Sequence, residues 1–292
     1  MKKNIKILFI IAVITCLLLC LSGCKKNEKD EKLKIVTSFY PIYIMTSNIT
    51  KDVPGVELSN MAETNVGCIH NYTLKPVDLK KMEKANIFIE NGLGIESFND
   101  KLINSFKNLD IIDSSKNINA ISDNGEINGH SWTSIKNYIN QIEEITEKLK
   151  EKNPENGNIY TKNLEEYKNK LISLENKYDN NLSKLRNKKV VVLNEAFEYL
   201  LRDLEIETID IHTDHEESTI SAEKLKDIIN EMKENYINII IIDKSDNEKN
   251  AETIKKETGA EILKLNSCLN GNLDNDAYIN AMEENLNILS NI

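Results

Sequence analysis

A stripe of apolar residues that recurs every three or four positions runs through the middle of the chain, with charged residues between its members. Because apolar residues three and four apart share one helix face, this spacing predicts one long amphipathic helix within residues 154–187. About 30 helical residues would reach ~45 Å. The stripe covers only about three heptads, so we expect the helix to pack on its own protein; a coiled-coil dimer is the alternative. Its members are Leu164, Tyr167, Leu171, Leu174, Tyr178, Leu182 and Leu185.

Strand and helix patterns alternate on both sides of this helix. Such alternation is typical of parallel sheets with crossover helices, so the predicted fold class is α/β. We expect an N-terminal α/β lobe at residues 33–153, a linking helix at 154–187 and a C-terminal α/β lobe at 188–292. The expected strands lie near residues 33–38, 56–61, 87–90 and 109–112 before the helix, and near 190–193, 206–211, 237–242 and 261–265 after it.

The start of the chain has the pattern of an export signal. A basic beginning is followed by an apolar run at residues 7–19 and by Leu-Ser-Gly-Cys at 21–24, which together indicate secretion. A membrane-spanning anchor is the alternative, but about 15 apolar residues are few for a ~30 Å hydrocarbon core. The Leu-Ser-Gly-Cys ending resembles a bacterial lipobox, which implies a lipoprotein signal peptide at residues 1–23 and a lipidated Cys24. We therefore expect a protein anchored to the outer face of the cell membrane, with residues 24–32 as a charged tether.

Composition and motifs exclude several classes of function. The chain has 37 Lys and Arg against 47 Asp and Glu, and its net charge is −10. A nucleic-acid binder would carry a basic surface, so we expect no nucleic-acid partner. The sequence has no GxSxG, HExxH or phosphate-loop motif to supply a nucleophile or a phosphate site. The chain is therefore not expected to be an enzyme.

Two cysteines, Cys68 and Cys268, remain beyond the predicted signal and lipidation site. Export permits a disulfide, but a single distant pair is not a disulfide framework, so a disulfide and two free thiols both stay open. The absence of a CxxC motif disfavours a thiol redox module or a cysteine-rich zinc module.

The chain has four histidines. His70 is predicted in a loop after a strand, and His130 just ahead of a helix. His212 and His215 lie in an acidic stretch between a strand and a helix. Their spacing could hold a second, loosely bound metal, but a solvated loop is the interpretation we favour.

Several short sequence pieces follow one another along the chain after the signal. They are Val36-Thr-Ser-Phe-Tyr-Pro41, His70-Asn-Tyr72, Pro76 with Lys80-Lys-Met-Glu-Lys-Ala85, Asn91-Gly-Leu-Gly94, His130-Ser-Trp132, Glu195-Ala-Phe-Glu-Tyr-Leu200 and Ala251-Glu-Thr-Ile-Lys-Lys-Glu-Thr-Gly259. Together, and in this order, they resemble the zinc/manganese family of ABC-transporter solute-binding lipoproteins over essentially the whole chain after the signal. The resemblance implies two Rossmann-like lobes joined by one long rigid helix, with a metal site in the cleft between the lobes.

The resemblance also implies metal ligands, two from each lobe. His70 matches the first ligand and His130 the second. The third position, usually His in zinc carriers and Glu in manganese carriers, is Asn194 here. An amide oxygen is a weak donor, and Asn also suits the cap of the following helix. Glu195, the next residue, could take its place.

The fourth ligand implied by the resemblance is a carboxylate after the buried strand. Asp243 matches it, with Asp246 as a nearby alternative. Cys68 and Cys268 are further candidates if their loops face the cleft. Two imidazoles and one carboxylate suit a borderline divalent ion such as Zn²⁺.

The expected function is therefore capture of a divalent ion, zinc rather than manganese, as a transported ligand. The partner implied by the resemblance is an ABC metal permease in the membrane, and we expect the protein to be a monomer. The alternative is an adhesin or interaction lipoprotein on the same scaffold, with a metal site degraded at Asn194.

Overall fold

The computed structural model describes residues 32–64, 70, 72–123, 125–210 and 220–292. Residues Leu33–Ile292 form one compact unit. The predicted signal peptide, the lipidation site Cys24 and almost all of the tether lie outside the described residues. Within the described part of the chain, no helix is both long enough and apolar enough to cross a membrane.

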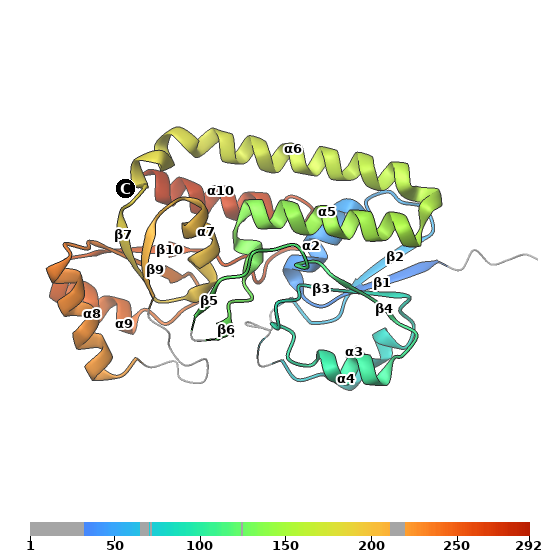
Figure 1. The fold of residues 1–292 in the computed structure, drawn as a ribbon, viewed down its shortest axis with the longest axis horizontal. Coiled ribbons are helices and arrows are strands. Elements are labelled where there is room, and N and C mark those ends of the chain that lie inside the picture. The colour runs from blue at the N-terminus through green and yellow to red at the C-terminus, as the bar shows by residue number, and fades with distance from the viewer. Residues whose placement is uncertain (1–31, 65–69, 71, 124, 211–219) are drawn as a thin grey trace, which may run out of the picture. The chain divides into compact units, whose positions relative to one another are not determined.

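The first half of the compact unit is built on a four-stranded sheet in the order β2-β1-β3-β4, and all its strands are parallel (Figure 1). The bounds of these strands are β1 (Leu33–Thr37), β2 (Val56–Asn60), β3 (Ile87–Glu90) and β4 (Asp110–Asp113). Every strand was expected within one or two residues of its observed place. The parallel arrangement brings the carboxyl ends of the strands to one edge of the sheet.

The helices of this half begin where the sequence offers suitable residues. A proline stands in the first turn of α2 and α3, where its missing N–H costs nothing. The Ser134 side chain accepts a hydrogen bond from the backbone N–H of Asn137 and so caps α5. Helix α4 and the short hairpin β5–β6 were not expected. The bounds are α2 (Tyr40–Ile49), α3 (Pro76–Met82), α4 (Asn99–Ser105), β5 (Ser122–Asp123), β6 (Glu126–Ile127), the 3-10 turn η2 (Ser131–Thr133) and α5 (Ile135–Lys152).

The second half repeats the plan with a parallel sheet in the order β10-β9-β7-β8. Strand β9 is buried along its whole length, as its unbroken run of isoleucines predicts. The bounds are β7 (Lys189–Val192), the 3-10 turn η5 (Glu195–Phe197), α7 (Glu198–Asp203), β8 (Glu207–Asp210), α8 (Ala222–Glu234), β9 (Ile239–Asp243), α9 (Lys249–Thr258), β10 (Glu261–Leu265) and α10 (Ala277–Ser290).

One long helix, α6 (Gly157–Leu182), lies between the two halves of the sequence, with the 3-10 turns η3 (Pro154–Asn156) and η4 (Ser183–Leu185) at its ends. The predicted apolar stripe is buried along it. Figure 1 shows α6 above α5 and α10, and its contacts include α2 as well. The stripe is therefore buried within the chain itself, as expected. The α/β class and the long helix are both confirmed.

A single apolar core extends across both halves, because α6 packs on helices from each of them. The Tyr138 ring stacks on that of Tyr278 with a centroid distance of 3.6 Å. The hydroxyl groups of Tyr138 and Tyr167 are 3.1 Å apart. Three elements, α5, α6 and α10, are thus joined by one group of buried tyrosines. A second, smaller apolar cluster lies within the second half.

Candidate metal centre

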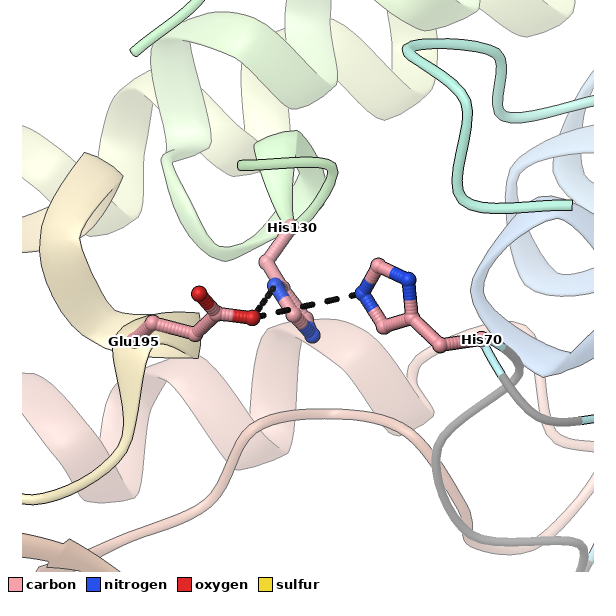
Figure 2. A group of neighbouring side chains, drawn as sticks. All are labelled: His70, His130 and Glu195. Atoms are coloured by element: carbon pink, nitrogen blue, oxygen red, sulfur yellow. Dashed lines mark ion pairs between the residues drawn. The ribbon is translucent and has the colours of Figure 1, made fainter. Parts of the chain in front are cut away.

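His70, His130 and Glu195 meet at one point, although they lie far apart in the sequence (Figure 2). Each offers one ligand atom, and these three atoms lie within 4.8 Å of one another. Ligand atoms that share an ion at about 2.1 Å stand roughly 3.4 Å apart, so side-chain adjustments of about 1 Å would bring the three residues to a common ion. Glu195 Oε1 lies 4.0 Å from His70 Nε2 and 3.6 Å from the Nδ1 side of the His130 ring.

His70 enters this group from the segment between β2 and α3. Its backbone oxygen accepts a hydrogen bond of 2.8 Å from the Ser97 hydroxyl. Ser97 lies just before α4. The His70 side chain as a whole is partly exposed, whereas its Nε2 is buried and faces Glu195.

His130 is the buried member of the group, with a side-chain exposure of 4%. Its backbone oxygen accepts a hydrogen bond of 3.0 Å from the Thr133 hydroxyl, which stabilises the turn at η2. Its ring centroid lies 5.2 Å from the ring of Trp132. Asn128 Oδ1 is 2.9 Å from His130 Nδ1. The ring is thus held on two sides before any ion binds.

Glu195 lies just beyond the carboxyl end of β7, as the first residue of η5. The side chain of the preceding residue, Asn194, makes its hydrogen bonds with Ala196 and Asp246 and not with the two histidines. Its Oδ1 accepts a hydrogen bond of 3.1 Å from the backbone N–H of Ala196, and its Nδ2 donates to Asp246 at 3.0 and 3.3 Å. Asn194 is therefore the cap of η5. The structure brings Glu195, the alternative third ligand, to the two histidines.

Asp243 does not join the group of three among the described residues. Its Oδ1 accepts hydrogen bonds from the backbone N–H of Ser245, at 2.7 Å, and from the Ser245 hydroxyl. Its Oδ2 accepts from the backbone N–H of Ser267 at 2.7 Å. Asp246 in turn accepts a bond from the backbone N–H of Asp243, and burial raises the pKa of the Asp246 carboxyl. Both carboxylates thus serve the turn after β9.

Cys268 is a free, buried thiol and is not part of the group. Its Sγ lies 3.6 Å from the backbone oxygen of Asn266. Burial raises the pKa of this thiol well above its ordinary value, and only a thiolate is a good metal ligand. The other thiol, Cys68, and the pair His212 and His215 lie outside the described residues.

The three side chains offer nitrogen and oxygen donors to an ion. Two imidazoles and a carboxylate form one of the known ligand sets for Zn²⁺, with a position left for a fourth ligand.

Comparison with protein-family models shows to which family the chain belongs. The model described as "Zinc-uptake complex component A periplasmic" matches residues 35–292. The chain belongs to this family. The zinc-uptake component A family consists of solute-binding proteins for metal transport, so the expectation that this member is not an enzyme is confirmed, as is its resemblance to the metal-binding solute-binding proteins.

Two relatives match almost the whole length of this chain. The manganese ABC transporter substrate-binding lipoprotein PsaA of Streptococcus mitis is 25% identical over 304 residues, which are 98% of this chain and 97% of PsaA. The high-affinity zinc uptake system protein ZnuA of Bacillus subtilis is 27% identical over 312 residues, 97% of this chain and 95% of that protein. The names of the two relatives thus specify different ions.

A solved structure shows the same fold. The solute-binding protein FpvC of Pseudomonas aeruginosa, in complex with Ni²⁺, superposes with a TM-score of 0.80 over 89% of this family member and 96% of FpvC. The sequence identity is 23%. The two-lobed α/β architecture of the zinc-uptake component A family is thereby confirmed for this chain.

Proposed function

We propose that this protein binds one divalent ion through His70, His130 and Glu195 and delivers it to an ABC permease. The observation that carries the proposal is the convergence of these three ligand atoms within 4.8 Å. It is supported by family membership and by relatives whose names specify metal uptake. Anchoring through a lipid on Cys24, at the outer face of the cell membrane, completes the proposal, since the PsaA relative is named a lipoprotein.

We infer that zinc is preferred to manganese. Two of the three proposed donors are imidazole nitrogens, which suit Zn²⁺, whereas Mn²⁺ favours sites richer in oxygen. Zn²⁺ also binds N/O ligands more tightly than Mn²⁺ in the general order of stability. Competition of the two ions for the purified protein, with each at a buffered free concentration, tests this choice.

Replacement of the two histidines tests the site itself. The double variant His70→Ala/His130→Ala should bind no zinc, whereas the wild type should bind about one ion per chain by elemental analysis. The matched control is His212→Ala/His215→Ala, which removes the same residue types from the acidic stretch and should keep the wild-type stoichiometry. Circular dichroism should show the same helix content in all three proteins. Unchanged zinc in the first variant would refute the ligand assignment.

The adhesin alternative depended on a degraded third ligand at Asn194. Asn194 caps η5, and the proposed ligand set has Glu195 at this place instead. The proposal therefore does not include a degraded third ligand, which was the reason for the alternative.

A further inference from the structure

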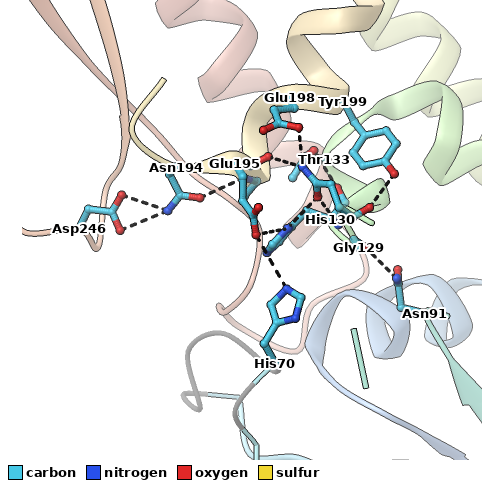
Figure 3. A network of polar contacts seen from close by, with 12 residues as sticks. His70, Asn91, Gly129, His130, Thr133, Asn194, Glu195, Glu198, Tyr199 and Asp246 are labelled. Carbon is cyan, nitrogen blue, oxygen red and sulfur yellow. Dashed lines mark hydrogen bonds and ion pairs between the residues drawn. The ribbon is translucent and has the colours of Figure 1, made fainter. Parts of the chain in front are cut away.

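Asn128 lies between the two segments that carry His130 and Glu195, and it is 7% exposed. Figure 3 shows the polar network around His130, Glu195 and Glu198, to which its hydrogen bonds belong. Its Nδ2 donates to the backbone oxygen of Glu195 and to Glu198 Oε2, both at 2.9 Å. Its Oδ1 accepts from the backbone N–H of His130 at 2.9 Å and lies 2.9 Å from His130 Nδ1. One amide therefore contacts both ligand segments.

These contacts determine which way the amide points. The backbone oxygen of Glu195 and the Glu198 carboxylate are acceptors, so both require the NH₂ end of Asn128. The backbone N–H of His130 is a donor and requires the oxygen end. All three assign Oδ1 to the side of His130 and exclude the flipped amide.

The orientation of Asn128 in turn determines the protonation of His130. A carbonyl oxygen accepts hydrogen bonds and cannot donate them. The hydrogen between Oδ1 and Nδ1 must therefore belong to the imidazole. In neutral His130 this leaves Nε2 as the nitrogen with a free lone pair, the one able to bind an ion.

We propose that Asn128 is a positioning residue of the metal centre: it fixes the Nδ1–H tautomer of His130, presents Nε2 to the ion and ties this ligand to the Glu195 segment. The inference rests on the proposed function, and it adds a residue that does not contact the ion. It also assigns the nitrogen through which His130 binds.

The backbone of Asn128 is itself held firmly. Its N–H donates to the Ile121 backbone oxygen at 2.9 Å, and its oxygen accepts from the Tyr199 hydroxyl at 2.7 Å. The same hydroxyl accepts from the Ile121 backbone N–H at 3.0 Å. Tyr199 belongs to α7, which follows Glu195 in the sequence. The loop before His130 is thus clamped to the helix after Glu195, so the two ligands are pre-organised.

Glu198 is buried, with an exposure of 6%, and accepts one of the two hydrogen bonds donated by Asn128. The hydrogen bond that Asn128 donates to Glu198 polarises the amide, so that Oδ1 becomes a better acceptor for the His130 Nδ1–H. A stronger acceptor at Nδ1 raises the basicity of Nε2 and so favours binding of an ion there. Glu198, Asn128 and His130 thus form a hydrogen-bonded series of a carboxyl group, an amide and an imidazole.

Two substitutions separate the roles of the two ends of the amide. Asn128→Leu removes the acceptor and the donors at similar volume. Asn128→Asp keeps an acceptor for His130 and loses the hydrogen bonds to the Glu195 segment and to Glu198. The matched control is Asn153→Leu, because Asn153 is also 7% exposed and accepts buried hydrogen bonds from Asn156 and Tyr160. Residues 33–292 form a compact unit and are the protein to use.

The first measurement is nitrogen-15 NMR of the His130 ring in the metal-free protein, and the second is zinc affinity by chelator competition. The wild type should show the Nδ1–H tautomer. Asn128→Leu should lose the fixed tautomer and bind zinc about 10- to 100-fold more weakly, the usual effect of removing a partner of a metal-binding histidine. Asn128→Asp should keep the tautomer and lose less affinity than Asn128→Leu. Asn153→Leu should lower the melting temperature and leave tautomer and affinity unchanged.

The Nδ1–H tautomer with unchanged zinc affinity in Asn128→Leu would overturn the proposal. An equal loss of affinity in Asn153→Leu would also overturn it, because the effect would then be one of general stability. The tautomer is measured without metal. If the wild type shows the Nδ1–H tautomer but binds no zinc, the proposed function fails while the positioning of His130 by Asn128 stands.

Discussion

The indole Nε1 of Trp132 donates a hydrogen bond of 2.8 Å to the backbone oxygen of Ser267. Trp132 lies beside His130, and the backbone N–H of Ser267 donates to Asp243 Oδ2. A chain of contacts therefore leads from Asp243 to His130 and joins the two halves of the protein. Asp243 is connected to the candidate metal centre through this chain and not through the group of three ligand atoms.

Substitution of Asp243 distinguishes a ligand from a supporting residue. We expect Asp243→Asn to keep zinc affinity within about tenfold of the wild type, because the contact with the centre passes through Ser267 and Trp132. Glu195→Gln should lower the affinity much further, since it removes a charged donor from the proposed site. Chelator competition with the two variants in parallel measures both effects. If the two substitutions weaken binding equally, Asp243 belongs among the ligands.

The single tryptophan should report the arrival of the ion. Trp132 is the only Trp in the chain, and its ring lies 5.2 Å from that of His130. A charge placed on His130 changes the electric field at the indole, so zinc should change the emission in a saturable way at about one ion per chain. The change should vanish in His130→Ala. A titration that leaves the emission flat while elemental analysis finds bound zinc would show that the ion sits elsewhere.

Asn194→His provides a test of the third-ligand position. If Asn194 were a degraded ligand, an imidazole there would raise zinc affinity by about an order of magnitude, or ~1.4 kcal/mol. The structure predicts no gain, because Asn194 caps η5 and donates to Asp246. Loss of such a cap costs about 1 kcal/mol of stability, so the melting temperature should fall. A tenfold gain in affinity would contradict the assignment of Glu195.

The fold was largely predictable because its signals are local. The eight strands of the two parallel sheets were expected from short apolar runs, and α6 from the spacing of its buried leucines and tyrosines. Helix α4 was missed, since only seven residues form it and its sequence, NDKLINS, has little apolar periodicity. The hairpin β5–β6 has two residues in each strand, too few for an alternating pattern.

The candidate site was predictable only in part, because a ligand set depends on which side chains turn inward. His70 and His130 were expected, and the structure places them together. Asn194 and Glu195 are adjacent, so their positions in the sequence alone do not decide which of them faces the histidines. The capping preference of Asn was the one available signal. For Asp243, the hydrogen bond to Ser267 joins residues 24 positions apart and could not be anticipated from the sequence.

Glu96 should make the stability depend on pH. Its carboxyl accepts hydrogen bonds from the backbone N–H groups of Asn91 and Gly92, at 2.7 and 3.1 Å, and its side chain is buried. Burial raises its pKa from 4.5 to about 8. The native state then holds a proton that the unfolded chain has released. The protonated Glu96 carboxyl contributes fully to the free energy of unfolding below about pH 4.5. This contribution is lost as the pH rises to about 8, and the free energy of unfolding falls by up to about 1.4 kcal/mol per pH unit.

Urea unfolding of Glu96→Gln from pH 5 to 8 measures this effect. The wild type should lose stability relative to the variant as the pH rises, because Gln does not titrate. A constant difference for Glu96→Gln would show that Glu96 is already ionised in the native protein at pH 5.

Helix α6 should restrict movement of the two halves on metal binding. It packs on α2 and α5 from the first half and on α10 from the second. Lys170 and Lys177 on α6 form ion pairs with Asp276 and Glu283, near and within α10. A large movement of one half of the protein toward the other would require these packed helices to slide past one another. Such sliding would open the apolar core that the helices share and is therefore unfavourable.

We therefore expect zinc to cause only a small or local change in shape. Small-angle scattering of residues 33–292 should give nearly the same radius of gyration with and without zinc, at a protein concentration where the proposed site is saturated. The His70→Ala/His130→Ala variant, measured in the same two buffers, controls for effects of the ion on protein association. A marked decrease in radius in the wild type alone would show that the contacts of α6 with α10 or α5 yield on binding. Tyr278→Leu should then enlarge the change, because it removes the stacked ring that joins α10 to Tyr138.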